Sequence, residues 1–303
     1  MYPLKPGCFS DVQDLDHNLP VFHTRIQKAL KSPKPFNISF MFILFLPGSF
    51  RRSSDYLWLS TCLADSGDYY FVDYPLSSTV AKLNSEFFDS DSHLQVRREF
   101  IYGSASQPNS KLGVAYEESI MGTFLTQVRQ HHGFHLSERE ILLQTLVVGH
   151  SQGAGHAAVM AIDFELCGVL LIAGPADSYQ QFPSEWTGMK VTTPSSRLRM
   201  FLHAEDRHAR MCLHHATMLG LKRIDVLTSS TSLEDILLSQ VVIDTRPLPP
   251  LKSHDCLTLD TKMRDDLNSL YLTGVIRHYQ AYLRSVSSRL ERSRVDSLPA
   301  SSL

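Results

Sequence analysis

The 303-residue chain is short of the features that mark metal-binding, secreted or membrane-spanning proteins. Its five cysteines are scattered and odd in number, so they do not form the disulfide framework of a small secreted domain. Its fourteen histidines show no His-Glu-x-x-His spacing, and no cysteine pair at ligand spacing accompanies them, so we expect neither a metal site nor a cofactor. The longest apolar run, residues 40–46, is far too short to cross a bilayer, so we expect no stable membrane insertion.

Charge of one sign is not in excess either. The formal net charge is −2, so composition offers no electrostatic case for a nucleic acid or an anionic membrane as partner. Residues 1–10 contain Pro3, Pro6 and Gly7 and no apolar segment, so no signal peptide is visible. A hydrophobic fraction of 43% and a charged fraction of 20% are ordinary for a globular enzyme. Because the cysteines form no disulfide framework and neither a signal peptide nor a membrane-spanning run is visible, we expect a cytoplasmic protein.

Short apolar runs alternate with helical patterns along most of the chain. Residues 38–46 and 167–174 are nearly continuous apolar runs, as in parallel strands that are buried on both faces. Residues 117–131 carry apolar side chains at helical spacing, which predicts an amphipathic crossover helix. Further strands are expected at residues 68–75, 142–148, 198–203 and 240–244, and further helices at residues 56–63, after residue 151 and at 267–286. The alternation predicts one α/β domain with a mostly parallel, doubly wound central sheet flanked by helices.

We expect this domain to occupy residues 37–286, after an N-terminal extension at 1–36 and before a disordered tail at 287–303. Two segments inside it, residues 76–115 and 178–196, have no clear pattern. The first is long for a simple connection. We expect both to cover the site and to carry its specificity.

The stretch Leu146-Val147-Val148-Gly149-His150-Ser151-Gln152-Gly153-Ala154-Gly155-His156-Ala157-Ala158 organises the chain. An apolar strand runs into Gly-His-Ser-Gln-Gly and then into an alanine-rich helix, which is the order of the G-x-S-x-G nucleophile elbow. Gly149 and Gly153 are needed because a Cβ on either would collide with neighbouring backbone in so tight a turn. Ser151 is therefore the predicted nucleophile, at a helix N-terminus that favours negative charge.

A nucleophilic serine also needs two backbone N–H groups that stabilise the oxyanion of the tetrahedral intermediate. One is expected from Gln152, the residue after the nucleophile. The other is expected from Ser49 or Phe50, in the loop that follows Pro47-Gly48 at the end of the first long strand.

The base and the acid of a triad follow the serine in the chain order Ser, Asp or Glu, His. His254 follows the last expected strand on a proline-rich loop and is the predicted base, although a surface-loop histidine would look the same. Asp206 comes two residues after the strand at 198–203 and is the favoured acid. Asp177 occupies the equivalent place one strand earlier and remains the alternative.

These residues resemble the α/β-hydrolase superfamily, and more narrowly a group of bacterial-type esterase-like serine hydrolases, over residues 38–285. The resemblance lies in Leu46-Pro47-Gly48-Ser49, the elbow at 149–158, Gly174-Pro175-Ala176-Asp177, the strand end at 201–206, and Ser253-His254-Asp255-Cys256-Leu257-Thr258. The chain departs from it at Phe50-Arg51, where small residues are expected. The resemblance implies an esterase or lipase that acts on a small acyl ester through an acyl-enzyme. A thioesterase, an acyltransferase and a non-catalytic binding protein of the same fold are the alternatives, and oligomeric state stays open.

Overall fold

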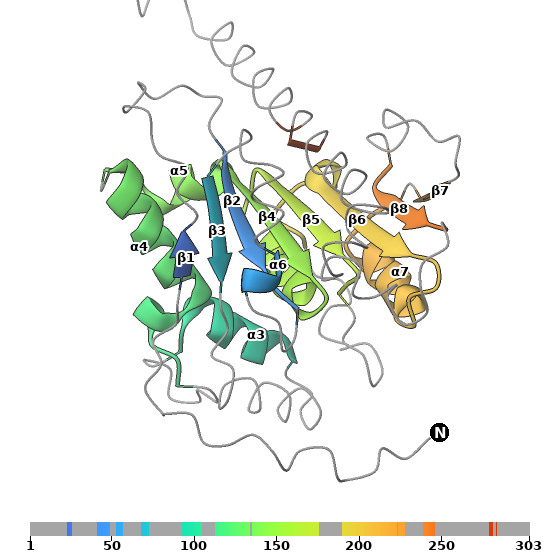
Figure 1. Ribbon diagram of the computed structural model, residues 1–303, viewed down its shortest axis with the longest axis horizontal. Helices are drawn as coiled ribbons and strands as arrows, with labels where there is room; N and C mark the ends of the chain where they lie inside the picture. Colours follow the sequence, from blue (N-terminus) through green and yellow to red (C-terminus); the bar gives the residue numbers. More distant parts are fainter. Residues whose placement is uncertain are drawn as a thin grey trace, which may run out of the picture.

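In the computed structural model, the described residues are 23–25, 41–48, 53–56, 68–72, 93–104, 113–133, 135–175, 190–222, 224–227, 239–245, 279–280 and 283. Their strands form one eight-stranded sheet in the order β1-β3-β2-β4-β5-β6-β8-β7 (Figure 1). Strand β1 is antiparallel to β3, and all other neighbours are parallel. The strands are β1 (His23–Arg25), β2 (Phe42–Leu46), β3 (Asp68–Val72), β4 (Thr145–His150), β5 (Gly168–Ile172), β6 (Leu198–His203), β7 (Ile224–Leu227) and β8 (Val241–Asp244).

The helices between the strands begin and end at residues suited to that place. The hydroxyl of Ser119 accepts a hydrogen bond from Gly122 N at the start of α4, and Gly133 ends this helix with a φ of 112°. Ser137 and Glu140 form a capping box at the start of α5. The described helices are η1 (Ser53–Tyr56), α3 (His93–Tyr102), η2 (Tyr116–Glu118), α4 (Ile120–His132), α5 (Glu138–Leu143), α6 (Gln152–Asp163), η4 (Ser195–Arg197) and α7 (Ala209–Met218), with further helical residues at 279, 280 and 283.

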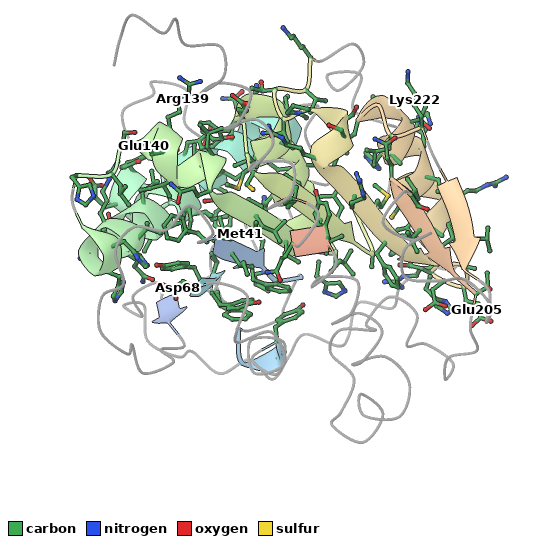
Figure 2. All side chains as sticks on the ribbon, turned by 90° about the horizontal axis from the view of Figure 1, so that it is seen from above. Met41, Asp68, Arg139, Glu140, Glu205 and Lys222 are labelled. Carbon is green, nitrogen blue, oxygen red and sulfur yellow. The ribbon has the colours of Figure 1, made fainter. Side chains whose placement is uncertain are left out.

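Both faces of the sheet are buried, and alternate strand residues serve the two faces. Leu44, Val147 and Leu171 point to one face, where α3, α4, α6 and α7 pack. Their neighbours Ile43, Val148 and Leu170 point to the other face, where they join Tyr56 of η1 and the helical residues Tyr279 and Leu283. Figure 2 shows the sheet from above between these two layers. The prediction of an α/β fold with a mostly parallel, doubly wound sheet is confirmed.

Some element boundaries differ from expectation. Leu142 and Leu143 belong to α5 rather than to the elbow strand, which begins only at Thr145. The apolar run could not distinguish the two, because a buried helix end and a buried strand have the same composition. Strand β7 was not anticipated; it pairs with β8 at the sheet edge, and its Val226 is exposed. Residues 23–25, inside the expected N-terminal extension, pair with β3.

The path of the chain reverses direction across the sheet at β2. The next strand, β3, lies on one side of β2, and β4 lies on the other. In open α/β sheets, such a switch point opens a crevice at the carboxyl ends of the two strands that flank it. The carboxyl ends of β2 and β4 are therefore the expected place for a site. None of the described helices is long and apolar enough to span a membrane.

Candidate active site

Ser151 joins β4 to α6 in a backbone conformation that few residues other than glycine adopt. Its φ is 53° and its ψ −115°, outside the usual left-handed region. Such a conformation costs on the order of 1–3 kcal/mol and persists only where the surroundings enforce it. Here they do: Ser151 N donates to the carbonyl of Ile172 in β5 (2.9 Å), and Ala154 N donates to the carbonyl of Ser151 (3.0 Å). The side chain is half-buried at the carboxyl edge of the sheet.

The two glycines of the motif are required by backbone on both sides. A Cβ on Gly149 would stand 2.3 Å from the carbonyl oxygen of Gly153. A Cβ on Gly153 would stand 2.1 Å from the carbonyl oxygen of Leu46, in β2. Real Cβ atoms do not approach backbone so closely, and backbone cannot move aside as a flexible side chain can. The predicted reason for both glycines is confirmed.

Gly48, which follows the end of β2, packs against the Cβ atom of Ser151. A Cβ on Gly48 would lie 3.3 Å from Ser151 Cβ and 3.1 Å from His150 Nδ1. The N–H of Gly48 donates to the hydroxyl of Tyr56 (3.0 Å), so it is engaged within the protein. An oxyanion donor from this loop must therefore come from a later residue. Ser49 and Phe50, the two predicted donors, lie outside the described residues.

Gln152 is the first residue of α6, and its backbone is held from below by a buried arginine. The first N–H groups of a helix have no acceptor within the helix, so they can face a ligand. Arg97 of α3 is 1% exposed, and its Nη1 donates to the carbonyl of Gln152 (3.2 Å). A Cβ on Gly155 would stand 2.4 Å from the same nitrogen, so this glycine makes room for the guanidinium.

His156 lies one and a half turns into α6 and packs away from the serine, as predicted. Its Nδ1 is 3.4 Å from Arg97 Nη1, and its ring is 5.2 Å from that of Phe100. Burial, and then the positive charge of Arg97, hold the pKa of His156 well below its usual value. The ring is therefore neutral at physiological pH.

Sequence reasoning missed Arg97, which lies in the patternless segment 76–115. Gly155, one turn after Ser151 in α6, is the sequence signal that could have indicated a side chain packed closely against the start of this helix.

Asp206 lies in the turn between β6 and α7. Its side chain is 4% exposed, and its Oδ1 accepts a hydrogen bond from His208 N (2.8 Å). Strand β6 is separated from β4 by β5 alone, so the end of β6 is about 10 Å from the end of β4 along the same edge. An imidazole can bridge a carboxylate and a hydroxyl held at the two ends. Asp177 and His254 lie outside the described residues.

The two histidines next to Asp206 are tied to their own loop. His203 Nδ1 accepts from Glu205 N (3.2 Å), and His208 Nε2 accepts from Arg207 Nε (2.8 Å). Each ring therefore uses an acceptor nitrogen in a local bond, which does not favour either one as a mobile base. No group of three or more His, Cys, Asp or Glu side chains in the described part of the chain is arranged to hold a metal ion.

Comparisons with known proteins find likeness only at the level of three-dimensional structure. No protein-family model matches the chain, and no curated protein sequence matches it either. Among solved structures it is similar to a carboxylesterase from Bacillus cereus, with 13% identity, 78% of this chain and 92% of that chain covered, and a TM-score of 0.40. It is similar to a dienelactone hydrolase from Anabaena variabilis, with 14% identity, 80% and 87% covered, and a TM-score of 0.43.

A phospholipase/carboxylesterase from Dyadobacter fermentans is also similar, with 15% identity, 81% and 97% covered, and a TM-score of 0.37. These three structural neighbours are esterases and hydrolases.

Proposed function

We propose that the chain is a serine hydrolase of the α/β-hydrolase class that cleaves a small carboxylic ester, with Ser151 as its nucleophile. The observation that carries this proposal is the backbone of Ser151, which departs from ordinary geometry at the carboxyl end of a central strand, directly against Gly48. Strain of this kind is costly and is concentrated at functional sites. A serine of no chemical importance would not need it.

The proposed reaction is a double displacement. Ser151 Oγ attacks the ester carbonyl carbon while His254 takes its proton, and Asp206 orients the resulting imidazolium. The tetrahedral oxyanion accepts hydrogen bonds from Gln152 N and from Ser49 or Phe50, each worth on the order of 3 kcal/mol. The intermediate expels the alcohol, which takes the proton from His254. A water molecule then hydrolyses the acyl-enzyme by the same steps in reverse.

Replacing Ser151 by alanine tests the nucleophile. The variant should lose turnover of p-nitrophenyl esters by a factor of about 10⁴ or more, together with covalent labelling by a fluorophosphonate, because no other group can form the acyl-enzyme. Peptide mapping of the labelled wild-type chain should find the adduct on residue 151. Unchanged turnover in the alanine variant would refute the assignment.

Two comparisons refine the proposal. Asp206→Asn and Asp177→Asn should differ greatly in turnover number, because only the true acid holds the base in its productive tautomer.

A panel of oxygen esters and thioesters separates an esterase from a thioesterase, since the fold itself says little about the acyl substrate. A folded wild-type chain that reacts with no probe would indicate a non-catalytic binding protein.

A further inference from the structure

Tyr56 connects the two segments that would supply the oxyanion donors. It ends η1, after the β2 loop, and is completely buried. Its hydroxyl accepts a hydrogen bond from Gly48 N (3.0 Å) and lies 2.8 Å from His150 Nδ1. Gly48 precedes the two predicted donors of that loop, and His150 precedes Ser151. One hydroxyl group therefore ties both segments together within a few ångströms of the nucleophile.

The hydroxyl is held in place by its ring. The Tyr56 ring centroid is 4.7 Å from that of Phe45 and 5.7 Å from that of His150, and all three residues are buried. Phe45 is in β2 and His150 ends β4, so the tyrosine is wedged across the carboxyl ends of the two strands at the switch point. A rigid aromatic side chain fixes the position of a hydroxyl better than a flexible one would.

The hydroxyl of Tyr56 can serve both neighbours at once. A tyrosine hydroxyl has one proton to donate and lone pairs to accept with. Tyr56 Oη accepts the proton of Gly48 N and forms a second hydrogen bond with His150 Nδ1. Gly48, Tyr56 and His150 are therefore joined in one hydrogen-bonded series, and all three residues are buried.

We propose that Tyr56, acting through His150, is a positioning residue that holds the Gly48 loop and the elbow at the separation needed to stabilise the oxyanion. This inference rests on the proposed hydrolase function. Tyr56 touches no substrate, because it is fully buried. Its effect lies in the geometry of two backbone donors, for which a displacement of about 1 Å can cost 10²-fold in rate.

The experiment compares Tyr56→Phe with Tyr279→Phe. Tyr279 is equally buried, and its hydroxyl donates to the carbonyls of Arg197 and Val169, at the amino ends of the strands. Both substitutions remove one buried hydroxyl from the same face of the sheet, so both should lower the melting temperature by similar amounts. Tyr56→Phe should lower kcat for p-nitrophenyl acetate about 10- to 100-fold with KM within about twofold. Tyr279→Phe should keep kcat within about twofold of the wild type.

A trifluoromethyl ketone gives a second readout, because it adds to the serine as a tetrahedral oxyanion. Its inhibition constant should rise in Tyr56→Phe by about the same factor as kcat/KM falls, and should not change in Tyr279→Phe. A purely structural role for Tyr56 would not link these two quantities.

Variants at His150 keep the inference testable even where Tyr56→Phe fails to fold. His150→Asn retains a polar group that can hydrogen-bond near the position of Nδ1 and should preserve most of kcat, whereas His150→Leu should lose as much as Tyr56→Phe. The double variant Tyr56→Phe/His150→Leu should lose no more than either single variant, because both substitutions break the same series of hydrogen bonds. If Tyr56→Phe matches the wild type, or if it loses kcat only as much as Tyr279→Phe, the inference is wrong while the hydrolase proposal stands. A wild-type chain without turnover or labelling overturns both.

Discussion

Helix α6 begins beside the strained Ser151 and ends at Asp163, and the contacts at its two ends differ in kind. At the first end, backbone packs on backbone, and glycine is required at positions 149 and 153. At the other end, a carboxylate stands where the helix dipole disfavours negative charge, and side chains compensate for it. Arg98 of α3 binds Asp163 with two hydrogen bonds (2.8 and 2.5 Å), and the hydroxyl of Tyr102 donates a third (2.9 Å).

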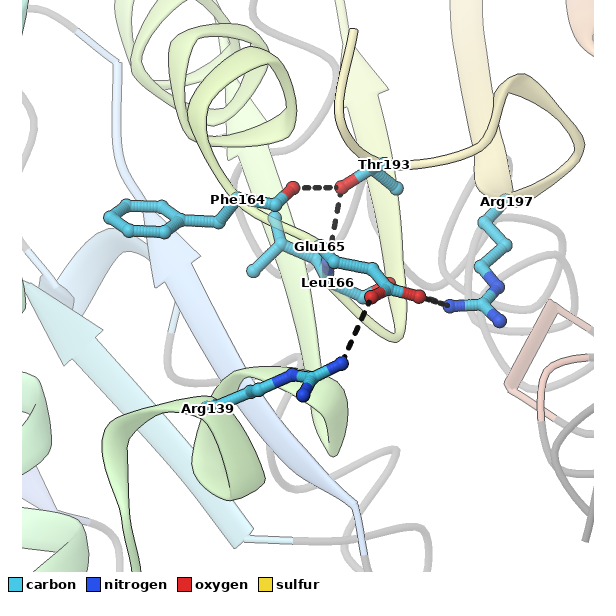
Figure 3. Close-up of polar contacts among 6 residues, drawn as sticks. All are labelled: Arg139, Phe164, Glu165, Leu166, Thr193 and Arg197. Atoms are coloured by element: carbon cyan, nitrogen blue, oxygen red, sulfur yellow. Dashed lines mark hydrogen bonds and ion pairs between the residues drawn. The ribbon is translucent and has the colours of Figure 1, made fainter.

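Residues 164–166, which follow the second end of α6, are also held by hydrogen bonds and ion pairs from side chains. Figure 3 shows Thr193 between two backbone groups: its hydroxyl donates to the carbonyl of Phe164 (2.6 Å) and accepts from Leu166 N (3.0 Å). Glu165 lies between Arg139 (4.0 Å) and Arg197 (3.6 Å). Burial and the charge of Asp163 raise the pKa of Tyr102, so its hydroxyl stays a donor. One end of the helix thus holds backbone strain at Ser151, the proposed nucleophile, and at the other end side chains satisfy the polar groups.

This contrast predicts that changes at the first end abolish activity, whereas changes at the second end cost only stability. Apart from the loss of the serine itself, the largest effect is expected for Gly153→Ala. Its new Cβ would stand 2.1 Å from the carbonyl oxygen of Leu46, so β2 and the elbow must separate. We expect kcat to fall more than about 100-fold and the free energy of unfolding to fall by about 1–3 kcal/mol. Ester turnover and urea denaturation measure the two quantities.

Gly113→Ala is the control for this change. It introduces the same methyl group at a φ of 65°, but nothing lies within 4 Å of the new atom. A loss of about 1 kcal/mol with unchanged turnover is expected there. Wild-type turnover in Gly153→Ala would show that the elbow tolerates a displacement, and the contrast would fail.

Thr193→Val should affect only stability. The valine has the same shape but leaves the carbonyl of Phe164 and the N–H of Leu166 without the hydroxyl between them. Because buried polar groups that lose a partner cost about 1–3 kcal/mol, we expect the free energy of unfolding to fall by about 2 kcal/mol. Turnover number should stay within about twofold. The neighbouring Thr192→Val, at an exposed position, should change neither quantity.

The smallest effect concerns pH. The pKa of His156 in the folded protein lies well below that of the unfolded chain, about 6.5. Below pH 6.5 the unfolded chain therefore binds a proton that the folded protein does not, and stability falls as pH falls. This one residue should contribute a slope of up to about 1.4 kcal/mol per pH unit between pH 6.5 and its folded pKa.

Urea denaturation of the wild type and of His156→Asn at pH 5, 6, 7 and 8 measures that slope. The variant should lose less stability than the wild type on acidification. His214→Asn is the matched control, because His214 is exposed on α7, and it should keep the wild-type slope. An equal slope in His156→Asn and the wild type would mean that folding does not lower the pKa of His156.

The sequence predicted the sheet and the tight turn from strand to helix at Ser151 well, because both are local. Continuous apolar runs mark strands buried on both faces, and strand β6 has the predicted bounds, residues 198–203. The glycines at 149 and 153 follow from the tightness of the turn, and the structure supplies the backbone atoms that require them. The base, the alternative acid and the loop donors lie outside the described residues and stay predictions.

The neighbours of the site could not be predicted in the same way. Arg97 meets Gln152 across 55 residues of chain, and Tyr56 meets His150 across 94. Nothing in the local pattern around Arg97 or Tyr56 distinguishes it from any other arginine or tyrosine, since neither lies in a motif. Their importance comes from what the fold brings beside them.

By itself, the sequence determined a mostly parallel α/β sheet and a serine in a turn too tight for any side chain at positions 149 and 153. Both follow from periodicity and backbone sterics within short stretches of chain. Only the tertiary structure decided that a tyrosine hydroxyl joins the Gly48 loop to the elbow and that a buried guanidinium lies beneath Gln152. These contacts depend on where β2, β4 and α3 lie relative to one another, and strand order is set by packing of the whole core rather than by any one segment.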